Sequence, residues 1–160
     1  NRPSPPALSA SMSPGAASMK AARFYDKGDI RIEDIPEPTV APGTVGINVA
    51  WCGICGTDLH EFMEGPIFIP PCGHPHPISG ESAPVTMGHE FSGVVYAVGE
   101  GVDDIKVGQH VVVEPYIIRD DVPTGEGSNY HLSKDMNFIG LGGCGGGLSE
   151  NTRFPASPHP

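Results

Sequence analysis

Hydrophobic and polar residues alternate along several short segments of this chain, which is the pattern of half-buried β-strands. Residues 29–35 are one such segment, in which Ile30 and Ile32 alternate with charged residues, and residues 20–25 before it can also form a strand. A tight turn is expected between them at residues 27–28. We therefore predict that the folded part of the chain begins with two strands joined by a turn.

Three further segments are predicted to be strands. Residues 45–51 alternate, residues 94–98 are continuously apolar, and residues 107–118 include three consecutive valines. No segment shows sustained helical periodicity, and a single helical turn is predicted at residues 57–60. Residues 63–86 are rich in proline and glycine and are predicted to form a long surface loop. The pattern as a whole predicts a turn-rich, mainly β domain.

Composition agrees with this pattern and limits the number of domains. Glycine (22) and proline (18) together make up a quarter of the 160 residues, as expected of a turn-rich fold. A chain of this length fits one domain with its own core. Residues 1–18 are mostly serine, alanine and proline, which cannot bury enough surface to offset chain entropy, so we predict a disordered extension there. A transit peptide is the alternative, but the segment contains a single arginine.

The charge balance argues against two classes of partner. Nineteen acidic residues against nine lysines and arginines give a net charge of −10, which disfavours binding to nucleic acid and to anionic membrane surfaces. No stretch is apolar for long enough to form a signal peptide or a membrane span. The four cysteines form no close-set disulfide framework, which fits a reducing compartment, and we expect a cytoplasmic protein.

The residues that carry chemistry fall into two blocks. Cys52–His60 supplies thiols, a hydroxyl and an imidazole, and Gly88-His89-Glu90 supplies an imidazole beside a carboxylate. A catalytic zinc usually takes three protein ligands of these kinds and leaves a fourth position open. The sequence therefore indicates a zinc centre built from both blocks.

The second block opens a longer motif, since Gly88-His89-Glu90 is followed by Gly93, Gly99 and Val102 at the spacing of a zinc signature. With the first block, this motif resembles the zinc-containing alcohol dehydrogenases of the medium-chain dehydrogenase/reductase superfamily. Residues 19–150 look like the catalytic domain of that family. The resemblance implies a mainly β fold, a GroES-like and partly open β-barrel with short helices and long loops.

Within the family, the chain is most similar to the butanediol and polyol dehydrogenases, on weaker features at residues 73–77 and 114–115. The resemblance implies oxidation of a secondary alcohol or diol, such as 2,3-butanediol, to the ketone. It also implies zinc and either NAD or NADP as cofactors. For the full-length family it implies a homo-oligomer.

The resemblance further implies roles for particular residues of the zinc centre. Cys55 and His89 are the expected zinc ligands, and Glu90 lies beside them or acts as an alternate ligand. Asp58 is expected to orient His89, because a carboxylate can fix the tautomer of a ligating ring. Cys52 is expected to be a small buried residue rather than a ligand.

Two residues of the first block are expected to move the proton of the substrate. The resemblance implies that Thr57 passes the hydroxyl proton onward and that His60 receives it near solvent. His110, which lies on a predicted strand, is expected to be a packed or edge histidine.

Two other patterns are weaker. Cys72, His74 and His76 could form a second metal cluster, but a closed structural zinc site needs four ligands. Gly140–Gly145 matches the G-x-G-x-x-G dinucleotide pattern, but that fingerprint must open a helix and be followed about 20 residues later by an acidic residue. We interpret this stretch as a glycine-rich turn that binds no cofactor.

The chain departs from the family in two places. Residues 119–133 lack the four cysteines of the family's structural zinc lobe, so we expect no structural zinc and a mobile lobe. Residues 151–160 are expected to be an unrelated tail, with the dinucleotide-binding Rossmann domain absent. Because that domain supplies NAD(P) binding and the remaining zinc ligand, we expect a weak zinc site and a chain inactive alone. The alternative is a stand-alone GroES-like module that binds a metal or a partner without catalysis.

Overall fold

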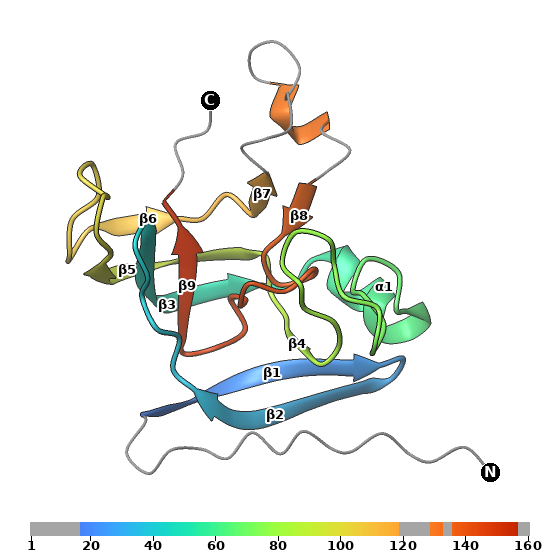
Figure 1. Ribbon diagram of the computed structural model, residues 1–160. Coiled ribbons are helices and arrows are strands. Elements are labelled where there is room, and N and C mark those ends of the chain that lie inside the picture. The colour runs from blue at the N-terminus through green and yellow to red at the C-terminus, as the bar shows by residue number, and fades with distance from the viewer. Residues whose placement is uncertain (1–16, 119–128, 133–135, 157–160) are drawn as a thin grey trace.

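The computed structural model describes residues 17–118, 129–132 and 136–156, which form short strands and long connections (Figure 1). The strands are β1 (Ser18–Asp26), β2 (Asp29–Pro36), β3 (Thr44–Gly53), β4 (Val85–Thr86), β5 (Glu90–Val98), β6 (His110–Val112), β7 (Tyr116–Ile118), β8 (Met136–Phe138) and β9 (Asn151–Pro155). The helices are α1 (Gly56–Glu64) and a 3-10 helix, η1 (Asn129–Leu132). The prediction of a mainly β fold with short helices and long loops is confirmed.

Antiparallel pairing arranges the strands in three sheets. β1 lies between β2 and β4, the four-stranded sheet has the order β6-β5-β3-β9, and β7 pairs with β8. Among the described strands no sheet closes on itself, which agrees with a partly open barrel. The ladder between β3 and β5 runs from Val45 opposite Val98 to Gly53 opposite Glu90. This ladder brings the two blocks of candidate residues together.

The strands predicted at residues 20–25, 29–35 and 45–51 are β1, β2 and β3, although Ile30 and Ile32 of β2 are exposed. Two other predictions need correction. The single strand predicted at residues 107–118 is two strands, because β6 ends at Val112 and β7 begins at Tyr116. Pro115 lies between them, and proline has no amide hydrogen to continue a ladder. The single helical turn predicted at residues 57–60 is part of the nine-residue helix α1.

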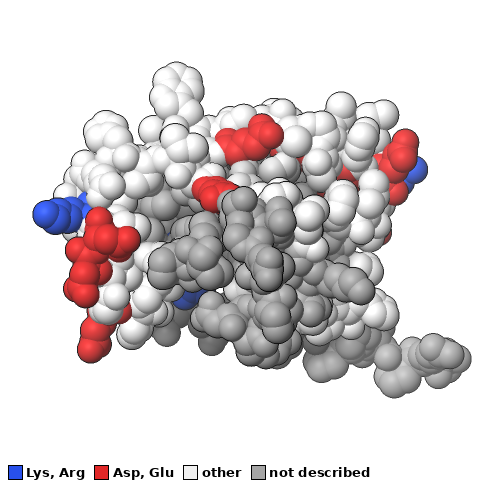
Figure 2. All heavy atoms as spheres, turned by 90° about the horizontal axis from the view of Figure 1, so that it is seen from above, with Lys and Arg blue, Asp and Glu red and all other residues white. Residues whose placement is uncertain are grey.

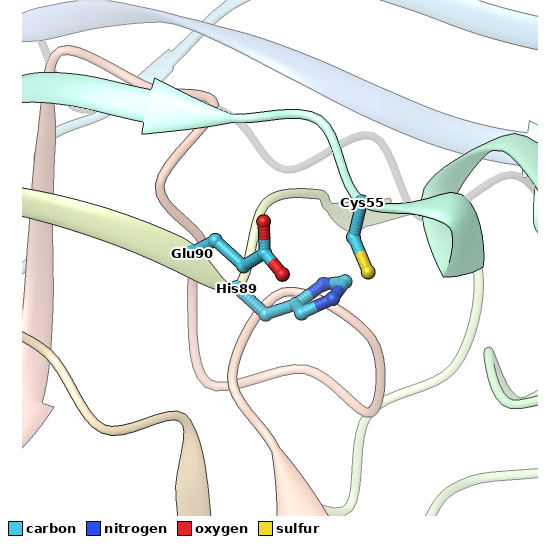
Figure 3. Close-up of side chains that lie close together, drawn as sticks. All are labelled: Cys55, His89 and Glu90. Atoms are coloured by element: carbon cyan, nitrogen blue, oxygen red, sulfur yellow. The ribbon is translucent and has the colours of Figure 1, made fainter.

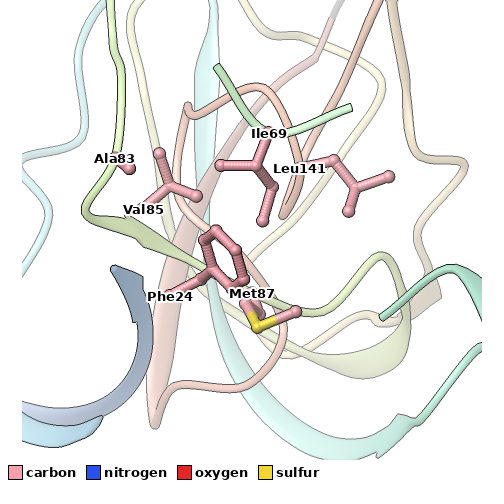
Figure 4. Packing of buried hydrophobic residues seen from close by; sticks show 6 residues of the cluster. All are labelled: Phe24, Ile69, Ala83, Val85, Met87 and Leu141. Atoms are coloured by element: carbon pink, nitrogen blue, oxygen red, sulfur yellow. The ribbon is translucent and has the colours of Figure 1, made fainter. Parts of the chain in front are cut away.

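The surface loop predicted at residues 63–86 is also partly wrong. Ile69 and Ala83 are buried, and the end of the segment forms β4, which pairs with β1. Figure 4 shows these residues packed in one hydrophobic cluster, whose members are Phe24, Ile69, Ala83, Val85, Met87 and Leu141. Single apolar residues that reach the core from a loop leave no periodic signal, so the pattern did not reveal them.

A second hydrophobic cluster packs together the strands next to the candidate ligands. Its buried members are Val45, Ile47, Phe91, Val95, Val113 and Ile139. β3 and β5 supply four of the six, and the segments after β6 and β8 supply the other two. The candidate site therefore rests on packed strands rather than on free loops.

Residues 151–155, expected to belong to an unrelated tail, form β9 and pair with residues 44–48 of β3. The chain just before β9 is also bonded to β1, where the amide of Ala22 donates to the carbonyl oxygen of Leu148 at 2.8 Å. The sheet therefore extends five residues past the expected domain boundary at residue 150.

Two other expectations fall largely outside the described residues. Of the extension expected at residues 1–18, the structure describes only Ala17 and Ser18, and Ser18 opens β1. Of the lobe expected at residues 119–133, it describes only η1. The expected disorder, the expected mobility and the expected lack of a structural zinc in these segments stay predictions.

Acidic groups dominate the charge of the chain, with 19 acidic residues against nine lysines and arginines. On the face drawn in Figure 2, acidic side chains show at several separate places with uncharged side chains between them. Basic side chains do not gather into a patch on the described part of that face. Neither described helix has the length and apolar character needed to cross a bilayer.

Candidate metal centre

The candidate ligands meet at one end of the β3–β5 ladder. Cys55 lies between β3 and α1, and His89 and Glu90 stand at the start of β5. Figure 3 shows the three side chains pointing toward one another. Their ligand atoms all lie within 4.8 Å of one another, and within the described part of the chain no other group of three or more His, Cys, Asp or Glu side chains comes together in this way. The fold thus gathers one thiol, one imidazole and one carboxylate.

Close backbone packing fixes the turn that presents His89. Gly88 has a φ of 97°, and a Cβ there would lie 2.5 Å from the backbone nitrogen of Leu148. Gly140 has a φ of 80°, and a Cβ there would lie 2.1 Å from the carbonyl oxygen of Gly88. Any other residue at either position would have a strained backbone, and its Cβ would clash with neighbouring backbone atoms. Gly140–Gly145 is therefore a turn packed behind the candidate centre, and the element that follows it is β9 rather than a helix.

Asp58 faces the ring of His89 from the first turn of α1. Its Oδ1 lies 3.5 Å from His89 Nδ1, and both side chains are buried. Its Oδ2 accepts the backbone N–H of Cys55 at 2.9 Å. Neither Asp58 Oδ1 nor His89 Nδ1 has a hydrogen-bond partner. Because the carboxylate lies on the Nδ1 side of the ring, Nε2 is the nitrogen left to bind a metal.

Neighbouring groups shift the pKa values of both Cys55 and His89. The pKa of His89 rises to about 9, chiefly through Asp58, although burial opposes the rise. The pKa of the Cys55 thiol is lowered, first by the backbone amide of Thr57 and then by His89. A lowered thiol pKa favours the thiolate, which is the form that binds metals, and a metal at His89 must displace the proton of the ring. Thiolate, imidazole and carboxylate are the ligand types of protein zinc sites, so this donor set fits zinc.

The three candidate ligands line a cleft with a volume of about 680 Å³. Thr57 also lines it, and most of the remaining lining is apolar: Trp51, Phe91, Val112, Val113, Pro115, Tyr116 and Phe138. The rings of Tyr116 and Phe138 pack with their centroids 4.7 Å apart. A few polar groups in a mainly apolar cleft of this size are typical of a site for a small organic molecule.

Comparison with known proteins identifies the family. A sequence model of the alcohol dehydrogenase GroES-like domain matches residues 41–159. The chain belongs to the zinc-containing alcohol dehydrogenase family. The family and the GroES-like fold expected from the sequence are thereby confirmed.

Butanediol dehydrogenases of the zinc-containing alcohol dehydrogenase family are similar to this chain. The (R,R)-butanediol dehydrogenases of Neisseria gonorrhoeae and Bacillus subtilis are 99% and 58% identical to it over 132 residues, which is 82% of this chain and 37% of each relative. The crystal structure of the 2R,3R-butanediol dehydrogenase from Bacillus subtilis matches with a TM-score of 0.79 and 56% identity, over 86% of this chain and 38% of that one. A zinc-binding dehydrogenase from Sinorhizobium meliloti, solved with NADP, matches with a TM-score of 0.72 and 30% identity, over 88% of this chain and 37% of that one. The chain thus spans less than two fifths of the length of these relatives.

The two residues expected to carry the substrate proton, Thr57 and His60, both lie on α1. Thr57 is half-buried and lines the cleft, with its Oγ1 3.7 Å from the Sγ of Cys55. His60 is exposed and follows three residues later. Residues three apart on a helix are neighbours on its surface. The helix therefore places Thr57 at the cleft and His60 at solvent.

The remaining candidate residues lie outside the centre. Cys52 is half-buried against the second hydrophobic cluster, and burial raises the pKa of its thiol to about 11. Cys72 and His74 are exposed and His76 is half-buried, and the structure does not bring these three into a metal-binding group. His110 is exposed on β6, at the edge of the four-stranded sheet, as expected of an edge histidine.

Sequence reasoning missed one buried acid on α1, the helix that carries Asp58. Glu61 of α1 is 0% exposed, and its carboxylate accepts the backbone N–H groups of Ile67, Phe68 and Ile69 at 2.9, 2.5 and 3.3 Å. It thereby ties the segment after α1 back to the helix. The available signal was the spacing from Asp58, because an acid three residues further along a helix faces the same side.

Proposed function

We propose that this chain forms the zinc- and alcohol-binding part of an NAD(P)-dependent dehydrogenase. The reaction would oxidise a secondary alcohol or diol, such as 2,3-butanediol, to the ketone. The observation that carries this proposal is the meeting of Cys55, His89 and Glu90 within 4.8 Å of one another at the wall of a mainly apolar cleft. The similarity to (R,R)-butanediol dehydrogenases supports the substrate class.

Cys55 and His89 would hold the zinc, with Glu90 beside them or as an alternate ligand. When bound, zinc supplies a Lewis acid that polarises an alcohol oxygen and favours loss of its proton. Asp58 would keep the His89 ring oriented, because its Oδ1 lies 3.5 Å from the ring Nδ1. The same carboxylate accepts the Cys55 amide, so one residue positions both ligands.

Thr57 and His60 would carry the substrate proton to solvent. A threonine hydroxyl can accept one proton while it donates another, and Thr57 presents its hydroxyl at the cleft. His60 is exposed on the same helix, from which it would pass the proton to solvent. The apolar side chains of Trp51, Tyr116 and Phe138 would contact the carbon chain of the alcohol and limit the access of water to the reacting oxygen.

The hydride acceptor in this proposal is NAD or NADP. The glycine-rich stretch Gly140–Gly145 packs behind Gly88, so we assign it no role in binding the dinucleotide. We expect the 160-residue chain assayed by itself with (R,R)-butanediol and NAD to show no turnover at an ordinary enzymatic rate. A rate of the order of 1 per second or more would contradict this expectation.

Asp58→Asn is expected to weaken zinc binding between about 10-fold and 100-fold, the usual effect of losing a carboxylate that orients a histidine ligand. The amide oxygen can still accept the Cys55 N–H, so α1 should begin at the same residue. Competition with a chromophoric chelator measures the affinity. Asp103→Asn, which changes an exposed acid elsewhere, is the matched control, and equal zinc affinities in the two variants would refute the proposed role of Asp58.

A chimaera tests the proposed reaction. The matching 132-residue segment of this chain would replace its counterpart in the (R,R)-butanediol dehydrogenase of Bacillus subtilis, which is 58% identical. We expect zinc-loaded chimaera to oxidise (R,R)-butanediol with NAD, and Thr57→Val to lower its kcat about 100-fold. Thr39→Val, at an exposed threonine, should leave kcat unchanged. A chimaera that folds and binds zinc and NAD but gives no turnover would count against the proposal.

A further inference from the structure

A second cavity lies where β1, the glycine-rich turn and β9 meet. Its volume is about 200 Å³, and it shares no lining residue with the cleft of the metal centre. The lining includes Arg23 of β1, Arg153 of β9, Glu81 and Cys144. The chain leading into β9 runs alongside β1 at this place (Figure 1). Two guanidinium groups from distant parts of the sequence therefore face one small space.

Neither arginine forms an ion pair with an acid in the part of the chain that the structure describes. Arg23 donates to the carbonyl oxygen of Pro84, and Arg153 Nη1 donates to the carbonyl oxygen of Thr39 at 3.2 Å. The ion pairs found within the described residues are Lys20–Asp34, Arg31–Asp29 and His89–Asp58. The cavity is therefore lined by two arginines and one carboxylate, that of Glu81, which leaves an excess of positive charge in its lining.

Two residues that line this cavity also carry buried polar atoms without a hydrogen-bond partner among the described residues. Arg23 Nε and the hydroxyl of Thr152 have no hydrogen-bond partner, and Thr152 is only 1% exposed. Buried polar groups in native proteins are almost always partnered, so two such donors in one wall indicate a missing acceptor. Glu81, the one acid in the lining, already accepts the backbone N–H of Cys144 at 3.0 Å.

We propose that this cavity binds a small oxyanion, which is either inorganic phosphate or the carboxylate of a short organic acid. Guanidinium groups bind paired anionic oxygens of both kinds through parallel N–H donors. A volume of about 200 Å³ admits such an ion and excludes a nucleotide. The site uses no residue of the metal centre, so the proposed anion binding and the proposed dehydrogenase function can be tested independently.

Titration of the ¹⁵N-labelled 160-residue chain with inorganic phosphate, and separately with acetate, tests the proposal through amide chemical shifts. We expect saturable shifts at Cys144, Gly145 and Ser149 with at least one anion, and the anion that causes them identifies the chemistry. Arg153→Gln should weaken the affinity about tenfold or more, because it removes a charged donor pair. Arg31→Gln changes an exposed arginine that does not line the cavity and should leave the affinity unchanged. No saturable shift with either anion, or an equal loss in both variants, overturns the proposal.

Arg153→Lys covers the case in which Arg153→Gln does not fold. It keeps the positive charge and loses the forked pair of donors, so the same anion should bind more weakly than to the unchanged chain. Unchanged affinity in Arg153→Lys would show that the guanidinium does not hold the anion and would overturn the site. We also expect the Tm of the unchanged chain to rise with increasing concentration of the bound anion. In Arg153→Lys this rise in Tm should be smaller.

Discussion

Replacing Cys55 by serine is expected to weaken zinc binding about 1,000-fold. A four-ligand zinc site contributes at most about 16 kcal/mol in binding free energy, so one thiolate accounts for about 4 kcal/mol of it. Cys55 precedes the first residue of α1, and serine is a favourable residue at that position. Cys55→Ser should therefore lower the affinity for zinc without unfolding the chain. Competition with a chelator of known zinc affinity, alongside the far-ultraviolet circular dichroism of the variant, separates the two effects.

Cys72→Ser is the matched control for this measurement. Cys72 is an exposed free thiol outside the centre, so its replacement should leave the zinc affinity unchanged. If Cys55→Ser retained one zinc per chain with the affinity of the unchanged protein, Cys55 would not be a ligand. The proposed centre would then have to be abandoned, because His89 and Glu90 alone do not make a catalytic zinc site.

Glu61→Ala is expected to lower the free energy of unfolding by about 4 kcal/mol. The carboxylate accepts three backbone N–H groups, those of Ile67, Phe68 and Ile69, and it is 0% exposed. Hydrogen bonds to a charged group contribute about 1.5–3 kcal/mol each, and alanine leaves the three donors without an acceptor. The cost of burying the charge itself reduces the sum, which is why the expected loss is smaller than three full bonds. Urea denaturation of the zinc-free chain measures it.

Glu64→Ala provides the comparison on the same helix. Glu64 is exposed, so its replacement should change the free energy of unfolding by no more than about 0.5 kcal/mol. Glu61→Gln should fall between the two alanine variants, because one amide oxygen remains to accept part of the bonding. If Glu61→Ala cost no more than Glu64→Ala, the segment after α1 would not depend on the buried carboxylate.

The strands that the sequence predicted best are long ones, since β1, β2 and β3 have nine, eight and ten residues. Alternation over that length indicated β2 and β3, although Ile30 and Ile32 of β2 are exposed. β4 has two residues and is paired only with β1, so it leaves no period to detect. Residues 151–155 were expected to belong to an unrelated tail, yet they lie within the match to the family model and pair with residues 44–48 as β9. Pairing of that kind is a property of the assembled sheet and not of the local sequence.

The grouping of the three candidate ligands was more predictable than the cleft around them. Cys55, His89 and Glu90 belong to short motifs, and the β3–β5 ladder brings the motifs together as expected. The cleft walls include Trp51 and Phe138, which are far apart in sequence and carry no motif. The role of Glu61 was not predicted for a similar reason, because its partners are backbone amides of a segment whose sequence is that of an ordinary loop. Contacts to backbone depend on the path of the chain, which side-chain patterns do not specify.

X-ray absorption spectroscopy of the zinc-loaded chain tests the proposed metal centre most directly. The arrangement of Cys55, His89 and Glu90 predicts one sulfur ligand at about 2.3 Å from the zinc, with nitrogen and oxygen as the other ligands. That sulfur should disappear in Cys55→Ser. A zinc without any sulfur ligand in the unchanged chain, or with two or more, would contradict the centre described above.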